Sequence, residues 1–354
     1  MKKLLFLLLF VFISESIFSQ TAPKYSNEFL AIGVGARGQA MGSSQVAVCE
    51  DVTGTYWNPA AVLHIKNKFQ AAAMHASYFA GIANYDYLGI ASSLDSNTSI
   101  GASLIRFGID NIPDTRQLVA PDGSINYDKV GSFSEASYAF MFTFAKRLPV
   151  LPIFKAKGLG DLLVGANVKV INRKAGIFGG AWGFGVDVGA QLSFKKWRFG
   201  VMGKDITSTI NFWNYNTETF ASVFLATGNK IKENSIEITL PRLIIDVARD
   251  FVWSKDLGFL LTAGLDFTFD GKRNTLIKTN LLSADLHAGM EINYQKKAFL
   301  RAGVGNFQEV KELGGTVYTK IQPNFGLGFV ISDFTIDYAL TNFGQNAGAL
   351  YSQT

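Results

Sequence analysis

The chain is poor in several residue types that mark familiar classes of protein. Its 354 residues include one cysteine, three histidines and eight prolines. A single cysteine excludes an internal disulfide framework, and we interpret Cys49 as a small buried apolar residue. The three histidines are widely spaced, and none forms an HExxH motif. The sequence therefore predicts neither a disulfide-stapled domain nor a zinc site.

Concentrated charge and catalytic motifs are also missing. The 33 basic and 28 acidic residues are scattered along the chain, so the net charge of +5 makes no nucleic-acid footprint. No GxSxG elbow, Walker A loop or dinucleotide-binding unit occurs, and no nucleophile and base stand at a suitable spacing. We therefore predict no catalytic residues, no metal, no cofactor and no nucleic-acid partner, and we expect the chain not to be an enzyme.

The long apolar run lies at the N-terminus. Lys2 and Lys3 precede LLFLLLFVFI, and the small and polar residues SESIFSQ follow. This order is typical of a secretory signal peptide, which we assign to residues 1–19 with cleavage near Ser19–Gln20. The run is too short to span a membrane comfortably, and no later segment is long and apolar enough to do so as a helix. We expect an exported protein whose membrane spans, if present, are strands.

From Phe69 onward the sequence alternates apolar and polar residues. In AWGFGVDVGAQLSF, Trp182 and Phe184 begin an apolar face, while Gly183 and Gly185 begin the opposite one. Such runs are longer than the roughly 5–6 residues of a soluble strand and match the roughly 9–11 of a membrane strand. Aromatic residues stand at several strand ends, as interfacial girdles do. The predicted fold class is all-β, a transmembrane antiparallel barrel.

The connections support the barrel independently. Tight turns follow most even-numbered strands and long loops follow most odd-numbered ones, the pattern of outer-membrane barrels. The connection after the fourth strand, LPVLPIFKAKG, is longer than this pattern predicts. An even strand number is normal, so we expect a last strand to be missing and the first and thirteenth strands to flank a gap. The thirteen expected strands lie near residues 69–79, 84–94, 97–107, 132–147, 159–173, 180–194, 196–204, 236–250, 257–269, 281–294, 297–306, 321–331 and 333–341.

Alternation also assigns polar side chains to the lumen face. We interpret them as a solvated lumen or as the docking surface of a plug, and His287 as a hydrogen-bonded polar group rather than a metal ligand. The alternating glycines Gly183, Gly185 and Gly189 fit as small residues that let a plug approach. The predicted lumen residues are Lys169, Arg173, Asp187, Asp266, Asp285, His287, Glu291, Arg301 and Asp337.

One long connection, DITSTINFWNYNTETF, is rich in aromatic residues. We predict an external loop that carries Phe212, Trp213, Tyr215 and Phe220. Aromatic side chains on a loop held by a rigid scaffold are typical anchors for a partner protein. They could equally fold back over the mouth of the barrel.

A short stretch before the first strand does not follow the strand pattern. In DVTGTYWNPAAVLH, Asn58 suits a helix N-cap and Pro59 suits the first helical turn. A capped turn satisfies its own backbone, so it can lie inside a lumen without joining the sheet. We predict a plug over residues 20–68 and a barrel over 69–354, with Trp57–Asn58–Pro59 anchoring the plug against the glycine-rich lumen face.

This N-terminal segment resembles the opening of the PorV/PorQ family of outer-membrane proteins. The resemblance covers some thirty residues of FLAIGVGARGQAMGSSQVAVCEDVTGTYWNPAAV. It departs from the family pattern at Gly38–Gln39–Ala40 and at Cys49–Glu50, and it does not separate the PorV branch from the PorQ branch. The matching plug-motif residues are Gly33, Gly35, Ala36, Arg37, Met41, Gly42, Asp51, Tyr56, Trp57, Asn58, Pro59 and Ala60.

The resemblance implies both a fold and a role. It implies a FadL-like barrel of about fourteen strands with a lumen plug, placed in the outer membrane of a Gram-negative bacterium. It also implies an accessory, shuttle or anchoring component of type IX protein secretion. The implied partners are outer-membrane lipid and the translocon, the surface-attachment complex or secreted C-terminal signal domains.

A second function is compatible with the same scaffold, namely a FadL-type channel for hydrophobic small molecules. A channel predicts a continuous apolar path from the loops into the lumen and a displaceable plug. A secretion component predicts a blocked lumen and an exposed apolar patch near the loops.

Overall fold

The fold is an antiparallel β-barrel. The computed structural model describes residues 26–120, 122–219, 221, 234–311, 315–344 and 350–353, so the predicted signal peptide lies outside the described residues. Seventeen strands belong to a single sheet, and every pairing in it is antiparallel. Within the described ranges, no helix combines the length and the apolar character that crossing a membrane requires. The predicted all-β fold class is confirmed.

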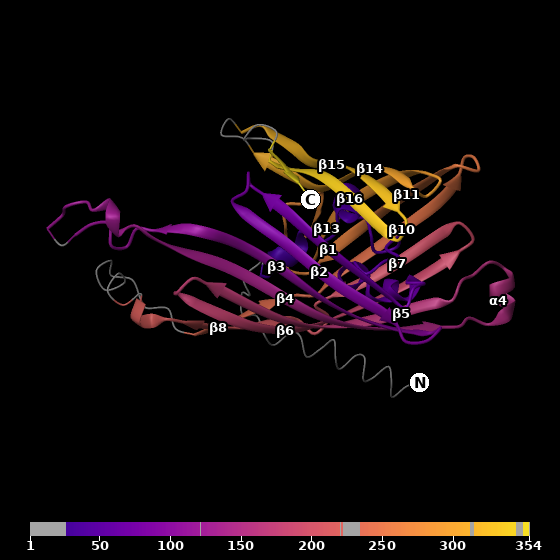
Figure 1. The fold of residues 1–354 in the computed structure, drawn as a ribbon, viewed down its shortest axis with the longest axis horizontal. Coiled ribbons are helices and arrows are strands. Elements are labelled where there is room, and N and C mark those ends of the chain that lie inside the picture. Colours follow the sequence, from indigo (N-terminus) through magenta and orange to yellow (C-terminus); the bar gives the residue numbers. More distant parts are fainter. Residues whose placement is uncertain are drawn as a thin grey trace.

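Fourteen of the strands close a ring in which each pairs with the next (Figure 1). In ring order they are β1 (Phe69–Tyr78), β2 (Ala83–Ser93), β3 (Thr98–Asp114), β4 (Gly131–Leu148), β5 (Leu162–Ala175), β6 (Gly179–Phe194), β7 (Trp197–Lys204), β10 (Arg242–Val252), β11 (Leu257–Thr268), β13 (Ser283–Tyr294), β14 (Ala298–Lys311), β15 (Val317–Ile331), β16 (Phe334–Gly344) and β17 (Leu350–Gln353).

Three further strands extend the wall at one end. β8 (Thr209–Tyr215) continues the line of β7 and pairs with the first half of β6, and β9 (Ser235–Thr239) pairs with β8. β12 (Ile277–Lys278) pairs with the start of β13. We call this end of the barrel the loop end. The opposite end, where short connections such as Lys195–Lys196 join the strands, is the turn end.

Alternation in the sequence becomes two faces of the wall. Along β4, Phe140, Phe142 and Phe144 are exposed, whereas the intervening Met141 and Thr143 are buried. Successive side chains of a strand point to opposite faces, so the aromatic residues form the outer surface and the others face the lumen. The outer surface of the ring is thereby apolar, and the inner surface carries small, polar and, where residues 26–68 pack, buried apolar side chains.

The predicted gap between the first and thirteenth strands does not occur. β17, four residues long, lies between them and pairs with β16 at Thr341↔Ser352 and with β1 at Ser77↔Gln353. The ring therefore contains an even number of strands, and closure gives each strand of the ring a hydrogen-bonding partner on both sides.

Two loops are also shorter than predicted, because their strands are longer. β3 continues to Asp114 and β4 begins already at Gly131, past a bulge in β3 between Ile109 and Ile112. β14 and β15 extend in the same way past a bulge between Gly305 and Gln308. A bulge places two residues opposite one and shifts the alternation, so a period-two pattern ends there although the strand does not.

The connection after β4 contains a short helix, α4 (Pro152–Ala156), which explains its unusual length at the turn end. Its backbone is bonded to the β6–β7 turn, where Gly160 N donates to Ser193 O at 2.7 Å and Lys195 N donates to Gly158 O at 2.9 Å.

Residues 26–68 precede β1 and occupy the inside of the ring (Figure 1). They form η2 (Glu28–Ala31), α2 (Ala36–Ala40), α3 (Gly54–Trp57) and η3 (Pro59–His64). The largest buried cluster joins them to the wall, because Tyr56 and Trp57 pack with Tyr85, Ile105 and other side chains of β1–β5. The hydrophobic core of the protein therefore lies between this segment and the barrel wall.

Candidate functional site: the plugged lumen

The capped turn joins the plug to the wall through one side chain. Asn58 is fully buried, and its Oδ1 accepts from Ala60 N at 3.1 Å, which caps η3. Its Nδ2 donates to Val46 O in the plug at 2.9 Å and to Ala190 O in β6 at 3.0 Å. One side-chain amide thus bonds to a carbonyl of the plug and to a carbonyl of a wall strand. The turn that it caps, η3, is a 3-10 helix.

Glycines in the wall give the plug backbone room to approach. A Cβ at Gly303 would lie 2.3 Å from Gly42 N, and one at Gly165 would lie 2.5 Å from the carbonyl carbon of Pro59. A main-chain contact recurs at Gly289, where Met41 O would lie 2.5 Å from a Cβ, whereas at Gly189 the side chain of Asn58 takes the space. Because these distances exclude a side chain, the wall and the main chain of the plug are in direct contact.

Two glycines from the predicted lumen face do not serve the plug. A Cβ at Gly183 would meet Asn211 Oδ1, and one at Gly185 would meet Thr209 Oγ1, both on β8. Their small size lets side chains of the neighbouring strand lie over them on the lumen face.

Trp57 packs chiefly within the plug, and the ammonium of Lys204 in β7 lies 5.8 Å from the centroid of its ring, which refines the predicted anchor. Its Nε1 donates to Val34 O at 2.8 Å. Its ring fills the space above Gly33 and Gly38, where a Cβ would come within 2.7 Å. The ring of Tyr56 packs edge-on at 4.9 Å, and its hydroxyl donates to Leu30 O at 2.6 Å. The tryptophan therefore holds the plug together, and Asn58 and Pro59 make the wall contact.

Further plug-motif residues shape the main chain of the plug. Gly33, Gly35 and Gly42 have positive φ angles of 95°, 77° and 63°, a region that only glycine adopts without strain. Asp51 accepts from Thr53 N at 2.8 Å and so forms a side-chain turn before α3. Ala36, Met41 and Ala60 are buried.

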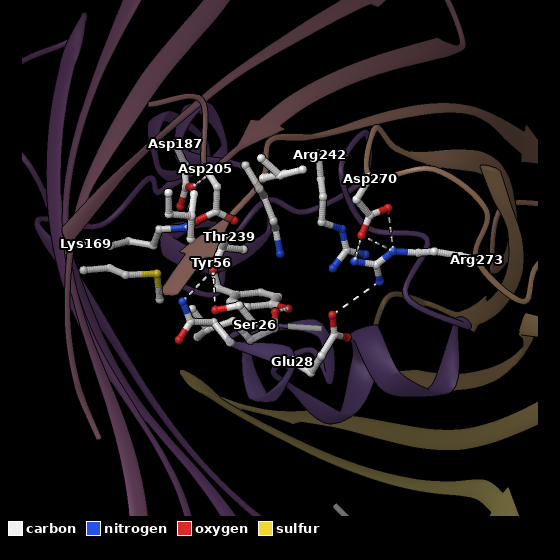
Figure 2. Close-up of a pocket in the computed structure, with 16 residues that line it drawn as sticks. Ser26, Glu28, Tyr56, Lys169, Asp187, Asp205, Thr239, Arg242, Asp270 and Arg273 are labelled. Atoms are coloured by element: carbon white, nitrogen blue, oxygen red, sulfur yellow. Dashed lines mark hydrogen bonds and ion pairs between the residues drawn. The ribbon is translucent and has the colours of Figure 1, made fainter. Parts of the chain in front are cut away.

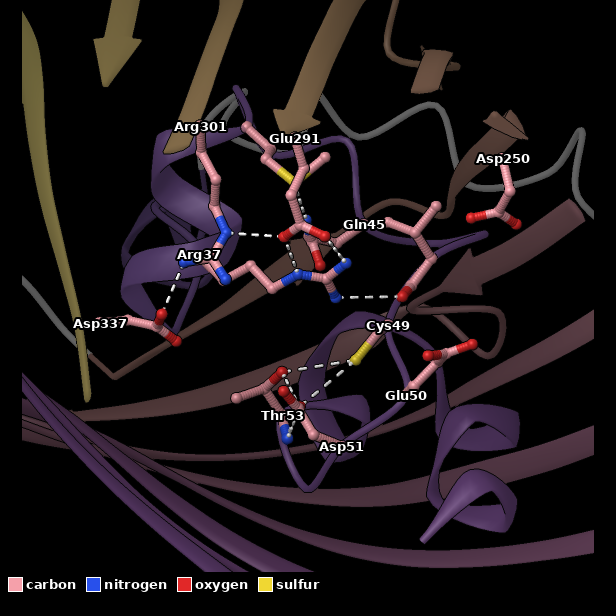
Figure 3. A network of polar contacts seen from close by, with 12 residues as sticks. Arg37, Gln45, Cys49, Glu50, Asp51, Thr53, Asp250, Glu291, Arg301 and Asp337 are labelled. Carbon is pink, nitrogen blue, oxygen red and sulfur yellow. Dashed lines mark hydrogen bonds and ion pairs between the residues drawn. The ribbon is translucent and has the colours of Figure 1, made fainter. Parts of the chain in front are cut away.

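A chain of four charges connects the plug to one side of the wall (Figure 3). Arg37 Nε lies 2.9 Å from Glu291 Oε2, which Arg301 Nε approaches to 2.7 Å. Arg301 Nη1 continues to Asp337 Oδ1 at 2.6 Å. Burial alone would lower the pKa of Arg37, but the Glu291 carboxylate more than offsets this and raises that pKa above its ordinary value.

A second charge cluster lies where the chain bends between β7 and β8 (Figure 2). Lys169 Nζ lies 2.7 Å from Asp187 Oδ1 and 2.5 Å from Asp205 Oδ1, and Asp205 N donates to Asp187 at 2.8 Å. Lys204 places its ammonium 3.8 Å from the centroid of the Tyr56 ring. Buried unlike charges with this many partners are compensated, which fits a structural role.

A third cluster surrounds His287 on β13. Its Nε2 lies 2.8 Å from Asp246 Oδ1, and the other oxygen of Asp246 accepts from Val46 N of the plug at 2.8 Å. Nearby, Arg242 forms an ion pair with Asp266, and Asp285 accepts from Phe307 N at 3.3 Å. Among the described residues, no group of three or more potential ligands could hold a metal ion.

The predicted partner loop is a strand instead. Phe212, Trp213 and Tyr215 lie in β8, because the alternation of TINFWNY continues the wall after the bend at Asp205–Ser208. Phe212 is exposed on the outer face. Trp213 faces the lumen, donates to Glu237 at 3.1 Å and stacks under Arg173, which also pairs with Glu237 at 3.1 Å. Phe220 lies outside the described residues.

Alternation could identify lumen residues but not the partners they meet. Asp205, Asp246, Glu237, Lys204 and Arg242 complete the charge clusters, and sequence reasoning did not single them out. For Lys204, Arg242 and Asp246 the available signal was their place within predicted strands. Asp205 lies just after the predicted strand 196–204, and Glu237 belongs to a separate strand, β9, that the sequence prediction merged with β10. The register between those strands decides which charges meet, and alternation alone does not specify it.

Cavities lie toward the loop end of the lumen. One of about 390 Å³ is bordered by Glu28, Ile32, Gln39, Arg242, His287 and Asn324. A smaller one of about 40 Å³ lies between Tyr56, Lys204, Arg242 and Arg273 (Figure 2). Both border residues 26–32, which we call the outer segment. It is held by Asn27 Nδ2, which donates to Thr239 Oγ1 at 2.8 Å, and by the Glu28–Arg273 pair at 3.3 Å.

Residues 33–64, which we call the inner plug, line these cavities at Gln39 and Tyr56 and also border the wall glycines. The one cysteine belongs to it and is buried beside Thr53, with Sγ and Oγ1 3.4 Å apart. Burial, helped by the nearby Asp51 carboxylate, raises the pKa of the Cys49 thiol. This thiol is therefore inert while the inner plug stays in place.

Comparison with solved structures identifies the type of fold. No family model and no curated relative matches the sequence. Solved structures that match include the toluene transporter TodX of P. putida, at 13% identity over 91% of this chain and 95% of that one, with a TM-score of 0.52. The monoaromatic hydrocarbon channel CymD matches at 12% identity over 88% and 92%, with a TM-score of 0.52. The Ralstonia pickettii toluene transporter TbuX matches at 11% over 91% and 96%, with a TM-score of 0.50.

These neighbours are outer-membrane barrels of the FadL family. None of the comparisons supports the resemblance to PorV/PorQ or a type IX role. At these identities the match concerns the path of the chain and not its chemistry. The fold of this protein is therefore that of a FadL-type barrel with its N-terminal segment inside the lumen.

Proposed function

We propose that this chain is a non-enzymatic outer-membrane channel of FadL type that admits hydrophobic small molecules. The observation that carries the proposal is the shared architecture, which covers about nine tenths of this chain and of the toluene and monoaromatic hydrocarbon transporters. The apolar outer wall of the ring suits a lipid environment, with the turn end in the periplasm and the loop end outside.

Passage through this barrel requires movement of the plug. The cavities at the loop end are bordered by the outer segment and reach the inner plug at Gln39, Gly42 and Ser43, and there the inner plug touches the wall through its main chain. The outer segment meets the wall through side chains, since Ser26 and Asn27 are bonded to Thr239 and Glu28 pairs with Arg273. Phe29 and Leu30 join it to the inner plug. We take it as the part that moves, because within the described ranges no main-chain contact with a wall glycine holds it. Displacing it would join the two cavities that it separates.

A disulfide clamp tests the proposal. We would introduce Asn27→Cys and Thr239→Cys in a Cys49→Ala background, since the two native side chains are within hydrogen-bond distance. In proteoliposomes, uptake of toluene or a long-chain fatty acid is expected to fall to the protein-free rate on oxidation and to recover on reduction. The single Asn27→Cys variant is the control. Equal uptake with the clamp closed, with it open and without protein contradicts the channel.

A specific observation favours a second candidate, a plugged barrel that serves type IX secretion as an accessory, shuttle or anchor. The cavity at the loop end is lined by charged and amide side chains such as Glu28, Arg242 and Asn324, rather than by an apolar path. The test is an affinity pull-down from detergent-solubilised outer membranes. Recovery of translocon, surface-attachment components or secreted C-terminal domains supports it, and recovery of none of them contradicts it.

A further inference from the structure

The outer wall of the barrel contains a hollow on the strands β10, β11, β13, β14 and β15. Neighbouring strands align in rows, and one row runs Val247–Ala263–Ala288–Val304–Pro323. The next row toward the turn end runs Arg249–Leu261–Met290–Ala302–Phe325. Three alanines, Ala263, Ala288 and Ala302, thus form a floor among bulkier side chains. We call the resulting cavity, of about 600 Å³, the alanine hollow.

Bulky apolar rows border the alanine hollow on both sides. Toward the turn end the row is Phe251–Phe259–Ile292–Leu300–Leu327, and toward the loop end it is Ile245–Leu265–Leu286. Rows two residues apart along a strand are roughly 7 Å apart, so the hollow and its two borders span about 20 Å of the wall. A depression of this length with an almost wholly apolar lining fits a hydrocarbon chain.

One cation stands at the lip of the hollow. Arg249 is exposed on the outer face, and its guanidinium lies 4.9 Å from the centroid of the Trp197 ring and 5.0 Å from that of Phe251. Both aromatic residues also line the hollow. Throughout the described ranges, no carboxylate forms an ion pair with Arg249, whereas the inward neighbour Asp250 is paired with Arg198 at 2.7 Å. An arginine that two rings hold in place and that lacks an acidic partner is suited to a phosphate group.

The adjoining turns strengthen this positive charge. The β6–β7, β10–β11 and β13–β14 turns carry the exposed lysines Lys195, Lys196, Lys255, Lys296 and Lys297. The one carboxylate in these turns is Asp256, which Gln295 contacts. Each basic residue near an anionic membrane surface contributes about 1 kcal/mol of attraction.

We propose that the alanine hollow binds an anionic phospholipid of the periplasmic leaflet. One acyl chain lies over Ala263, Ala288 and Ala302, and the phosphate contacts the guanidinium of Arg249 beside Trp197. A second copy of this chain is the less suitable occupant, because its own outer wall would bring a second Arg249 or further lysines to a surface that is already positive. This inference rests on the proposed position in the outer membrane and is independent of what passes through the lumen.

The experiment is native mass spectrometry of the purified full chain in detergent with equal amounts of phosphatidylglycerol and phosphatidylethanolamine of identical acyl chains. The wild-type protein is expected to retain phosphatidylglycerol preferentially. Arg249→Gln is expected to weaken this preference about tenfold, because a charge-assisted contact is lost. Ala288→Leu fills the floor and is expected to reduce retention of both lipids.

Matched controls remove a cation and enlarge an alanine on the outer face away from the hollow. Lys174→Gln removes an outward cation at the loop end of β5, and Ala102→Leu enlarges an outward alanine on β3. Both are expected to retain phosphatidylglycerol as the wild type does. Heat-dependent migration on gels verifies that each variant is a folded barrel. The proposal is overturned if folded Arg249→Gln and Ala288→Leu retain the lipids unchanged, or if the wild type retains a second chain instead of lipid. Failure of the uptake experiment above concerns the lumen and does not alter this readout.

Discussion

The inner plug and the outer segment are parts of one continuous chain inside one barrel, yet they are held in different ways. The inner plug contacts wall glycines through its main chain and enters buried charge clusters through Arg37 and Val46 N. The outer segment borders cavities and contacts the wall through side chains at Asn27 and Glu28. The difference separates a part that is seated on the wall through its main chain from a part that joins the core through Phe29 and meets the wall through polar side chains.

The largest effect is expected at Arg37 in the inner plug. Replacing it in Arg37→Met leaves Glu291 with one of its two arginine partners, and it removes the donor to Val48 O at 3.1 Å. Breaking a buried pair by removing one partner costs about 3–5 kcal/mol. Urea unfolding should show this loss, and Cys49 should react faster with a maleimide in the folded variant. A double variant Arg37→Met/Glu291→Gln that is more stable than the single one would show that the uncompensated carboxylate is the cause.

A smaller effect is expected from a methyl group added to the wall. Gly303→Ala puts a Cβ 2.3 Å from main-chain atoms of Met41 and Gly42, and such overpacking costs about 1–3 kcal/mol. Gly131→Ala is the control, because the nearest atom to its Cβ is 3.8 Å away, in Asp114. Unfolding free energies of the two variants are to be compared. Equal stability would show that the plug is not seated against β14.

Two substitutions of Asn58 distinguish its role as a cap from its role as a donor to the plug and the wall. Asn58→Ala removes both the cap on η3 and the donor to Val46 O and Ala190 O, at a cost of about 1–3 kcal/mol. Asn58→Asp keeps the capping acceptor but loses the donor. Thermal unfolding should therefore show both variants to be destabilised. If Asn58→Asp is as stable as wild type, the contact with β6 contributes nothing.

The outer segment should respond weakly to the same kind of change. Glu28→Gln removes a pair with Arg273 that is partly open to solvent, so the expected cost is about 0–1 kcal/mol. Maleimide reaction at Cys49 should stay as slow as in the wild type. A loss of stability as large as that in Arg37→Met would contradict the distinction between the two parts of the plug.

The smallest expected effect depends on pH and concerns the turn end of the inner plug. Burial lowers the pKa of His64, whose Nε2 lies 2.9 Å from Gln191 Oε1. The neutral imidazole is thus favoured in the folded state, so its contribution is present above the unfolded pKa of about 6.5 and is lost as the pH falls. The unfolding free energy should fall less in His64→Gln than in the wild type as the pH is lowered through about 6.5. An identical decline in both proteins would assign it to other groups.

How much of this structure the sequence predicts depends on the kind of feature. Strand positions and the inward direction of residues such as Lys169 and Glu291 follow from local alternation, which one chain segment contains by itself. The N-cap at Asn58 is equally local. The charge clusters are not local, because Glu291 meets Arg37 across 254 positions in sequence and Asp246 meets His287 across 41.

The errors have physical causes of the same kind. The sequence predicts TINFWNY as part of one long connection after the seventh strand, whereas pairing with β6 makes it a strand. The sequence predicts Trp57 as part of an anchor against the glycine-rich lumen face, whereas its ring packs mainly within the plug. Its pocket is formed by Gly33 and Gly38, within its own segment, and only the fold of that segment reveals this.

Under the proposed channel function, the glycine contacts also determine how fast the lumen opens. At Gly165, Gly289 and Gly303 the obstruction consists of peptide groups and not of side-chain tips. Rotamer changes take picoseconds to nanoseconds, but they move no peptide group out of the way. Opening at this level requires displacement of a whole backbone segment, which takes on the order of microseconds to milliseconds. An electrical recording of the purified barrel should therefore show long closed intervals and not the rapid flicker of a side-chain gate.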